Sequence, residues 1–435
     1  MIQIIISVII LVYAIINFKK GLIAFLAFQI VWFKDQQIIT IPGLASINID
    51  LIMDFAFLLL FITKRKKIKL SKVDFPLKTP FITLGCSWIL TSFSFKTSFF
   101  GEFVRAAGNI TIQLLFVVMI WYVLDNHKDF ITIFKYVTLI VFVANIYSLI
   151  EYALKYNPIL DYKLSLTSTE LETYNTNEYA VSYRGYRSSS IFEHTIAAAM
   201  VYGFYLVFTL IIINSFREKI KLEKFSIITC FLCIPGILLT KMRTGIFFVI
   251  IGVFFELIFA PKKISKRNLY NFLLIGFFGL IFIIPVISEN ISLILSIFSK
   301  DAQSAVGGSN ISWRITQAKY IFDYGKQTLF LGCGENFRKN ADLILLRKYT
   351  GDFESLWFEQ FLAHGLFGVT AYVILIYYLT FKLSKKYDSI HLLGFSLSYW
   401  ITYSMTSLPY FRTFLYFLIV FYFIKKTDLY KSMNR

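Results

Sequence analysis

Long apolar runs follow one another along almost the whole chain, and short polar stretches separate them. A run of ~20 apolar residues can cross a hydrocarbon core of ~30 Å as a helix, whereas a helix of a soluble protein keeps a polar face. The pattern therefore predicts an all-α, polytopic integral membrane protein with about 12–13 transmembrane helices. The predicted helices lie near residues 1–18, 21–33, 48–63, 79–95, 103–124, 131–154, 191–213, 225–241, 244–260, 268–288, 356–381, 390–406 and 409–424.

Two polar segments are much longer than the other connections, and they divide the chain into five parts. Residues 1–154 hold the N-terminal helices, 155–190 form a loop with a pair of arginines, and 191–288 hold the central helices. Residues 289–355 form a large loop, and 356–435 hold the C-terminal helices and a tail. The sequence shows no internal repeat and no soluble domain.

Lysines and arginines in the short connections predict which way the helices run. Cytoplasmic loops of membrane proteins carry an excess of these residues. With thirteen crossings, six basic regions fall on one side, which places the N-terminus and both long loops outside. These regions are Lys19–Lys20, residues 64–72, 217–224, 261–267 and 382–386, and the tail from Lys425. The net charge of +18 then reflects topology and contact with anionic lipid, and nucleic acid is not an expected partner.

Arginines on the predicted outer face run against this bias and need another explanation. Arg184 and Arg187 precede a helix in "SYRGYRSSSIFEHTIAAAM", and Arg243 lies between two helices in "LTKMRTGIFF". Arg314 lies in "SWRITQAKYIF" within the large loop. A guanidinium binds two phosphate oxygens at once, so these residues are candidates for an anion site. The alternatives are solvated loop charges and, for Arg243, a side chain that reaches the headgroups from a helix end.

Several neighbouring residues have local structural explanations. Ser189 or Ser190 can cap the following helix, and Glu193 would complete a capping box with Ser190. Apolar positions between residues 313 and 324 repeat at a helical spacing, which predicts an amphipathic helix on the outer surface. The stretch "FLGCGENF" then predicts a tight turn around its two glycines.

The four cysteines indicate neither a metal site nor a disulfide framework. Cys230 and Cys233 form a CxxC pair inside an apolar run, where we expect them to be small packing residues. Cys86 and Cys333 have no evident partner in the sequence.

The order of these motifs resembles the O-antigen polymerase and ligase family, which includes Wzy-type polysaccharide polymerases. The resemblance covers residues 180–370: an arginine turn before a helix, an arginine between two helices, and a large outer loop that ends in "FEQFLAHGLFGV". It implies an inverting, metal-independent glycosyltransferase without a cofactor, in the bacterial cytoplasmic membrane. The substrates would be undecaprenyl-pyrophosphate-linked oligosaccharides, and a chain-length regulator protein is a candidate partner.

The resemblance also implies roles for individual residues. Arginines at the membrane surface would stabilise the charge of the departing pyrophosphate, and an acidic residue would take a proton from the acceptor hydroxyl. The catalytic candidates are Glu354, Arg243 and Arg314. The substrate-binding candidates are Arg184, Arg187, Glu193, His194, Asp352 and His364, of which Asp352 is a competing base. Glu193 and His194 are expected to line the site or cap a helix, and His364 to be more a packing residue than a catalytic one.

Two other functions are compatible with this pattern. Ligases of the family carry a histidine, commonly followed by asparagine, where Glu354 and Ser355 stand here, and this departure favours a polymerase. A ligase that transfers glycan to a lipid or protein remains an alternative. A flippase for lipid-linked oligosaccharide would carry its charges along a central cavity and show two similar halves. The unusual charges of this chain lie instead on one predicted face, which favours an enzyme.

Overall fold

The computed structural model describes residues 2–31, 37–39, 47–71, 73–164, 185–192, 194–215, 224–259, 311–335, 337, 355–405 and 413–433. The predicted helix at 268–288 lies outside these residues. The regular secondary structure of the described residues is helical apart from one pair of short strands, which confirms the predicted fold class of a polytopic membrane protein.

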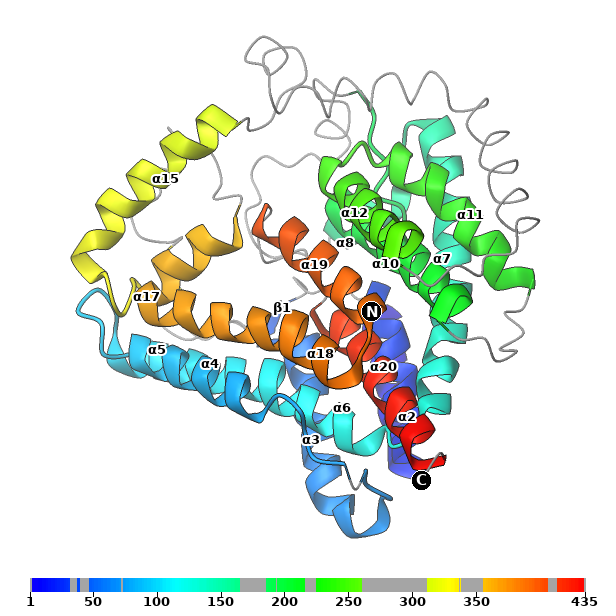
Figure 1. Ribbon diagram of the computed structural model, residues 1–435, viewed down its shortest axis with the longest axis horizontal. Helices are drawn as coiled ribbons and strands as arrows, with labels where there is room; N and C mark the ends of the chain where they lie inside the picture. The colour runs from blue at the N-terminus through cyan, green and yellow to red at the C-terminus, as the bar shows by residue number, and fades with distance from the viewer. Residues whose placement is uncertain are drawn as a thin grey trace. The chain divides into compact units, whose positions relative to one another are not determined.

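Four of the described helical stretches are long and apolar enough to cross a membrane: Phe99–Val123, His127–Leu154, Thr195–Ile212 and Leu356–Tyr387. Figure 1 labels most of the individual helices. They are α1 (Ile2–Ile16), α2 (Phe18–Phe28), α3 (Ile49–Lys64), α4 (Lys78–Thr91), α5 (Phe99–Asn109), α6 (Phe116–Val123), α7 (His127–Leu154), α8 (Pro158–Leu164), α10 (Thr195–Ser215), α11 (Lys224–Leu239), α12 (Arg243–Phe259), α15 (Ile311–Gly325), α17 (Leu356–Tyr377), α18 (Leu383–Tyr387), α19 (Ile390–Ser404) and α20 (Thr413–Met433). The strands β1 (Gln37–Ile39) and β2 (Ile47–Asn48) pair antiparallel.

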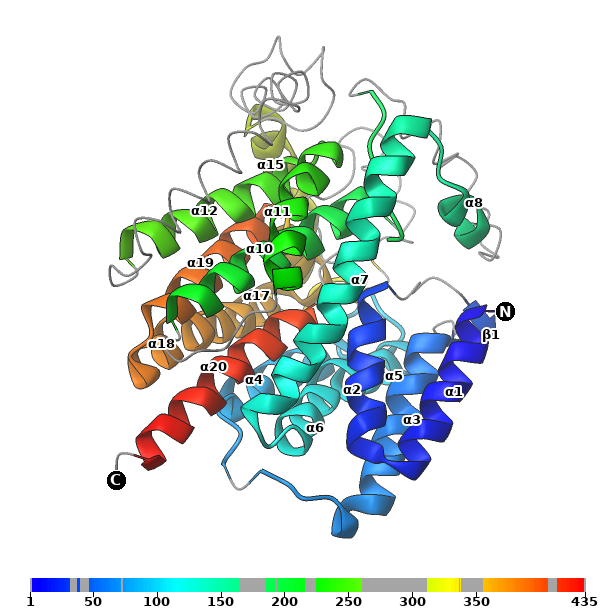
Figure 2. The ribbon, with the colours of Figure 1, turned by 90° about the vertical axis from the view of Figure 1, so that its right-hand side faces the viewer.

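The first of two compact units combines both ends of the chain: Met1–Tyr136, Thr316–Asp388 and Arg412–Arg435. In this unit α1 and α2 pack tightly, because a Cβ on Gly21 would lie 2.5 Å from the Cα of Ala14. Helix α3 packs beside both of them (Figure 2), and α4 packs along α17. The ring of Phe25 stacks on that of Phe57 with centroids 4.8 Å apart, which ties α2 to α3.

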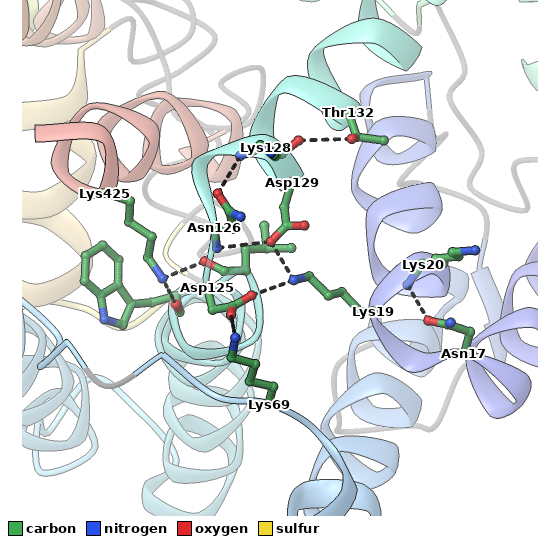
Figure 3. Close-up of polar contacts among 12 residues, drawn as sticks. Asn17, Lys19, Lys20, Lys69, Asp125, Asn126, Lys128, Asp129, Thr132 and Lys425 are labelled. Carbon is green, nitrogen blue, oxygen red and sulfur yellow. Dashed lines mark hydrogen bonds and ion pairs between the residues drawn. The ribbon is translucent and has the colours of Figure 1, made fainter. Parts of the chain in front are cut away.

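A polar network joins the end of α6 to other parts of this unit (Figure 3). The Lys19 ammonium lies 2.5 Å from an Asp125 oxygen and 2.7 Å from an Asp129 oxygen. Burial opposes the ionisation of Asp125, but the hydrogen bond from Lys19 and the charges of Lys19 and Lys69 outweigh it and lower the pKa of Asp125. The Lys425 ammonium donates to the carbonyls of Trp121 at 2.6 Å and Leu124 at 2.5 Å. The structure thus gathers three basic regions that the charge pattern assigns to one side of the membrane.

The second unit comprises Val137–Ile315 and Ser389–Phe411. Helix α10 packs against α11 and α12, and α12 packs against α19. Glycines allow these close contacts: a Cβ on Gly245 would lie 2.6 Å from that of Ala199, and one on Gly252 would lie 2.8 Å from Val207. Small residues at helix interfaces are the usual means of close packing in membrane proteins.

The predicted helix at 191–213 begins four residues later, at Thr195, so the proposed capping box is wrong. Ser190 adopts a left-handed conformation with φ of 55°, and its hydroxyl donates to the carbonyl of Ala144 at 2.6 Å. These contacts with α7 hold Ser190 outside the helix. The helix predicted at 313–324 is confirmed as α15, but its apolar positions do not share one buried face, because Ile315 is 54% exposed while Gln317 is buried.

Candidate functional site

Helix α17 is interrupted at Gly365, and a loop from the preceding part of the chain docks on the interruption. Gly365 has φ 61° and ψ −156°, a conformation that is essentially restricted to glycine. The amide of Cys333 donates to the carbonyl of Leu362 at 2.6 Å, and that of Gly334 donates to the carbonyl of Ala363 at 2.9 Å. The interruption therefore exposes carbonyls of α17 that anchor the predicted glycine turn.

The turn places Glu335 against His364. The Nε2 of His364 lies 3.0 Å from an oxygen of Glu335, and its Nδ1 lies 2.9 Å from the hydroxyl of Thr91 in α4. The same Glu335 oxygen accepts from the side chain of Asn109 at 2.9 Å. The imidazole is 2% exposed and Glu335 is 36% exposed, so the carboxylate is the accessible end of this chain of contacts.

An acidic and basic pair supports the turn from α5. Glu102 accepts a hydrogen bond from the backbone amide of Glu335 at 3.1 Å, and it forms an ion pair with Arg105 at 2.8 Å. Gly334 has φ 88°, and a Cβ there would lie 2.8 Å from the Glu102 carboxyl carbon. Glycine is therefore required for this close approach.

In the second unit, the loop that follows Gly185 is fixed by a single carboxylate. Glu151, near the end of α7, accepts hydrogen bonds from the hydroxyls of Tyr186 and Ser188, the amide side chain of Asn157, and the backbone amides of Ser189 and Ser190. The Ser188 amide also donates to the carbonyl of Leu239 at 3.0 Å. These contacts hold the loop against the ends of α7 and α11.

Positive charges gather where this loop meets the start of α12. Arg187 and Lys241 are 4% and 3% exposed, and a Cβ on Gly185 would lie 3.1 Å from the Lys241 nitrogen. A guanidinium nitrogen of Arg187 lies 3.9 Å from the sulfur of Met242. Arg243 is half-buried and is the first residue of α12. A helix N-terminus adds positive potential, so the arrangement suits an anion.

His194 caps the N-terminus of α10. Its Nδ1 accepts a hydrogen bond from the backbone amide of Ile196 at 3.1 Å. Burial, with a contribution from the charge of Arg187, lowers the pKa of His194 to about 4. The ring is therefore neutral at pH 7, as a capping acceptor must be, and its capping role agrees with one of the two roles predicted from the sequence.

Arg314 contacts the end of another helix of the second unit. Its guanidinium donates to the carbonyl of Met405, directly after α19, at 3.1 Å. A cation at a helix C-terminus is favourable, so this contact has a structural value of its own. The predicted catalytic role of Arg314 stays a prediction.

Four predicted site residues lie outside the residues that the structure describes: Arg184, Glu193, Asp352 and Glu354. Among the described residues, no group of three His, Cys, Asp or Glu side chains is placed to hold a metal ion.

Three residues of these sites were not singled out from the sequence. Glu151 carried a usable signal, because an acid in an apolar helix is a functional candidate by default. Lys241 stands two positions before Arg243 and has no separate signal in the sequence. Glu335 belongs to the glycine turn, and nothing in the local sequence relates it to His364. That histidine is buried, and both of its nitrogens have polar neighbours.

Comparison with known proteins identifies one region. Residues 228–373 match the family model described as O-Antigen ligase, Wzy_C. This confirms the predicted family relationship for a segment that contains Lys241, Arg243, Arg314, Glu335 and His364. No curated protein and no solved structure matches the chain.

Proposed function

We propose that this protein is a polysaccharide polymerase, because residues 228–373 of this multi-pass membrane protein match the family model described as O-Antigen ligase. It joins oligosaccharide repeat units carried on undecaprenyl pyrophosphate, at the outer face of the bacterial cytoplasmic membrane. The product is an O-antigen, capsule or exopolysaccharide, formed by inverting, metal-independent glycosyl transfer.

The observation that carries this proposal is the convergence of Arg187, Lys241 and the N-terminus of α12. Arg187 and Lys241 are nearly buried beside the N-terminus of α12, and the dipole of that helix adds to their positive charge. A leaving pyrophosphate concentrates negative charge as the glycosidic bond breaks. Cations that are already in place stabilise that charge without reorganisation, which lowers the barrier.

The arrangement of the loop supports the same role. The Glu151 carboxylate accepts five hydrogen bonds, among them one from the Tyr186 side chain before Arg187 and two from backbone amides after it, and so holds the loop that carries Arg187. A charged group held in this way is preorganised for its ligand. We therefore assign Arg187, Lys241 and Arg243 to the pyrophosphate clamp.

The experiment is a comparison of polymer length in cells that express single variants. Arg243→Ala and Lys241→Met should abolish long polymer while the protein inserts at normal levels. Arg243→Lys should restore polymer only in part, because an ammonium cannot reproduce the bidentate contact of a guanidinium. Arg65→Ala, at an exposed arginine, is the matched control and should leave polymer length unchanged. Wild-type polymer in both clamp variants would contradict the assignment.

A ligase is the second candidate, because the matching family model is described as an O-antigen ligase. The two activities leave different intermediates in a deletion strain. Loss of a polymerase leaves single repeat units, whereas loss of a ligase leaves full-length polymer on the lipid carrier. Single repeat units are the outcome expected here, since glutamate stands where ligases carry histidine.

A further inference from the structure

We propose that Glu335 is the general base of the glycosyl transfer, and that His364 is the residue that positions it. This inference rests on the proposed function and adds to it a residue that takes the proton of the acceptor hydroxyl. Glu335 lies in the first unit, within the segment that matches the O-antigen ligase domain.

Accessibility distinguishes Glu335 from the polar groups around it. Its side chain is 36% exposed, whereas His364 is 2% exposed and Glu102 is 7% exposed. Glu102 is also committed to an ion pair with Arg105 and to the backbone amide of Glu335. Of these three side chains, Glu335 is the most exposed to an acceptor.

The surroundings hold the carboxylate in one position. One oxygen of Glu335 accepts from the side chain of Asn109 at 2.9 Å and lies 3.0 Å from the Nε2 of His364. A carboxylate has no proton to donate, so Nε2 carries the hydrogen of that bond. His364 is fixed in turn by the Thr91 hydroxyl, 2.9 Å from Nδ1. A base must lie within hydrogen-bond reach of the proton it takes, so such fixing favours catalysis.

The backbone beneath Glu335 is also rigid. Amides of the turn donate to carbonyls exposed by the interruption of α17, and Gly334 packs against Glu102. Beside the turn, Cys333 and Phe337 are buried in a cluster with Leu362. The docked turn therefore fixes the position of Glu335, which lies in the turn, relative to His364, which lies in α17.

The reaction step balances as follows. The acceptor hydroxyl oxygen forms a bond to the anomeric carbon of the donor sugar, and the bond from that carbon to the pyrophosphate oxygen breaks. The electron pair of the broken bond leaves with undecaprenyl pyrophosphate. The hydroxyl proton moves to Glu335, which releases it to water after the product departs.

The test uses purified full-length protein and lipid-linked repeat units isolated from a deletion strain. Release of undecaprenyl pyrophosphate is the readout, because polymerase and ligase reactions both produce it. Glu335→Gln keeps an oxygen for Asn109 and His364 but loses the basic group. Its turnover should fall by ~10²–10⁴-fold, while its affinity for undecaprenyl pyrophosphate itself stays within about threefold of wild type.

Two further variants separate catalysis from structure. Asp323→Asn removes a carboxylate of α15 that is 67% exposed, and it should retain the wild-type rate. His364→Gln should lower turnover less than Glu335→Gln does and should shift the acid limb of the pH–rate profile, which a purely structural residue would not move. In Glu335→Gln, the residual rate should no longer fall as the pH is lowered.

The outcomes are distinct. The proposal is overturned if Glu335→Gln keeps the wild-type rate. It is also overturned if Glu335→Gln loses affinity for the carrier as well as its rate. In either case Glu354→Gln is the next variant to examine. If Glu335→Gln does not fold, Glu335→Asp replaces it: a reduced rate with the acid limb retained supports the proposal, and an unchanged rate contradicts it. A wild-type protein that releases no carrier contradicts the proposed function as well, whereas release without chain growth contradicts polymerisation alone.

Discussion

Gly365 faces the backbone of Phe330, and a side-chain carbon added at Gly365 would lie 2.5 Å from the Phe330 carbonyl carbon. The same glycine has φ 61°. No other residue type can occupy this position without moving either the docked loop or the helix, so both the contact and the backbone angle select glycine.

We expect Gly365→Ala to destabilise the protein by at least about 1–3 kcal/mol, the usual cost of a side chain in a backbone region restricted to glycine. The thermal unfolding midpoint in detergent measures the change. Gly108→Ala in α5 is the control, since an added Cβ there meets nothing within 4 Å. Alanine favours a helix interior, so this control should stabilise the protein by about 0.5–1 kcal/mol. Equal midpoints for the two variants would show that the interruption of α17 is not constrained.

Replacing Glu151 should release the loop that carries Arg187. Glu151→Gln keeps one acceptor oxygen but places an amide donor where the carboxylate accepts hydrogen bonds from other donors. An unpaired buried donor costs about 1–3 kcal/mol, so the unfolding midpoint should fall and long polymer should be lost. Asp74→Asn removes a carboxylate that is 88% exposed and should change neither quantity. Polymer of normal length in Glu151→Gln would show that this hydrogen-bond network is not needed for polymerisation.

The low pKa of His194 predicts a loss of stability in mild acid. Between the ordinary value of 6.5 and the folded value of about 4, the unfolded chain binds a proton that the folded chain does not. Stability therefore rises with pH across this window and falls as pH drops, with a slope of at most about 1.4 kcal/mol per pH unit. His194→Asn keeps a capping side chain that does not titrate.

The measurement is the unfolding midpoint at several pH values between 6.5 and 4. The difference between wild type and His194→Asn should change steadily in favour of the variant as the pH falls. Parallel curves for the two proteins would show that His194 takes up its proton without cost in the folded state.

Lys425 should contribute to stability through the end of α6. Its ammonium donates to two carbonyls there and lies 4.4 Å from the centre of the Trp121 ring. Lys425→Met preserves the apolar stem but removes the donors, and we expect a loss of about 1–3 kcal/mol in unfolding free energy. Lys385→Met, at an exposed lysine, should have little effect. An unfolding midpoint that is the same in both variants would contradict this role.

The sequence predicts those parts of the structure that depend on local composition. Apolar runs are enough to locate most of the described helices, and the spacing between residues 313 and 324 is enough to find α15. The predicted start of α10 is wrong because Ser190 bonds to Ala144, 46 positions away, and local capping rules do not include such a partner. The interruption at Gly365 has no local signal in the sequence, since apolar residues continue on both sides of it.

The candidate site residues also fall into two groups: those that the sequence indicates and those that only the packing of the chain brings together. Arginines such as Arg187 and Arg243 stand out because they oppose the expected charge bias. The contact between His364 and Glu335 joins residues 29 positions apart, and the contact of His364 with Thr91 spans 273 positions. Such pairs are set by the packing of α4, α17 and the glycine turn, and no sequence pattern encodes that packing directly.

The capping of α6 by Lys425 has a consequence for biosynthesis. The two partners are separated by as many as 304 positions, and α20 is the last of the described helices to leave the ribosome. The carbonyls of Trp121 and Leu124 therefore receive this donor only after the intervening helices have been translated. Insertion of α20 is thus a late, closing event in the assembly of the first unit, and a chain truncated before residue 425 would present an incomplete α6 to cellular quality control.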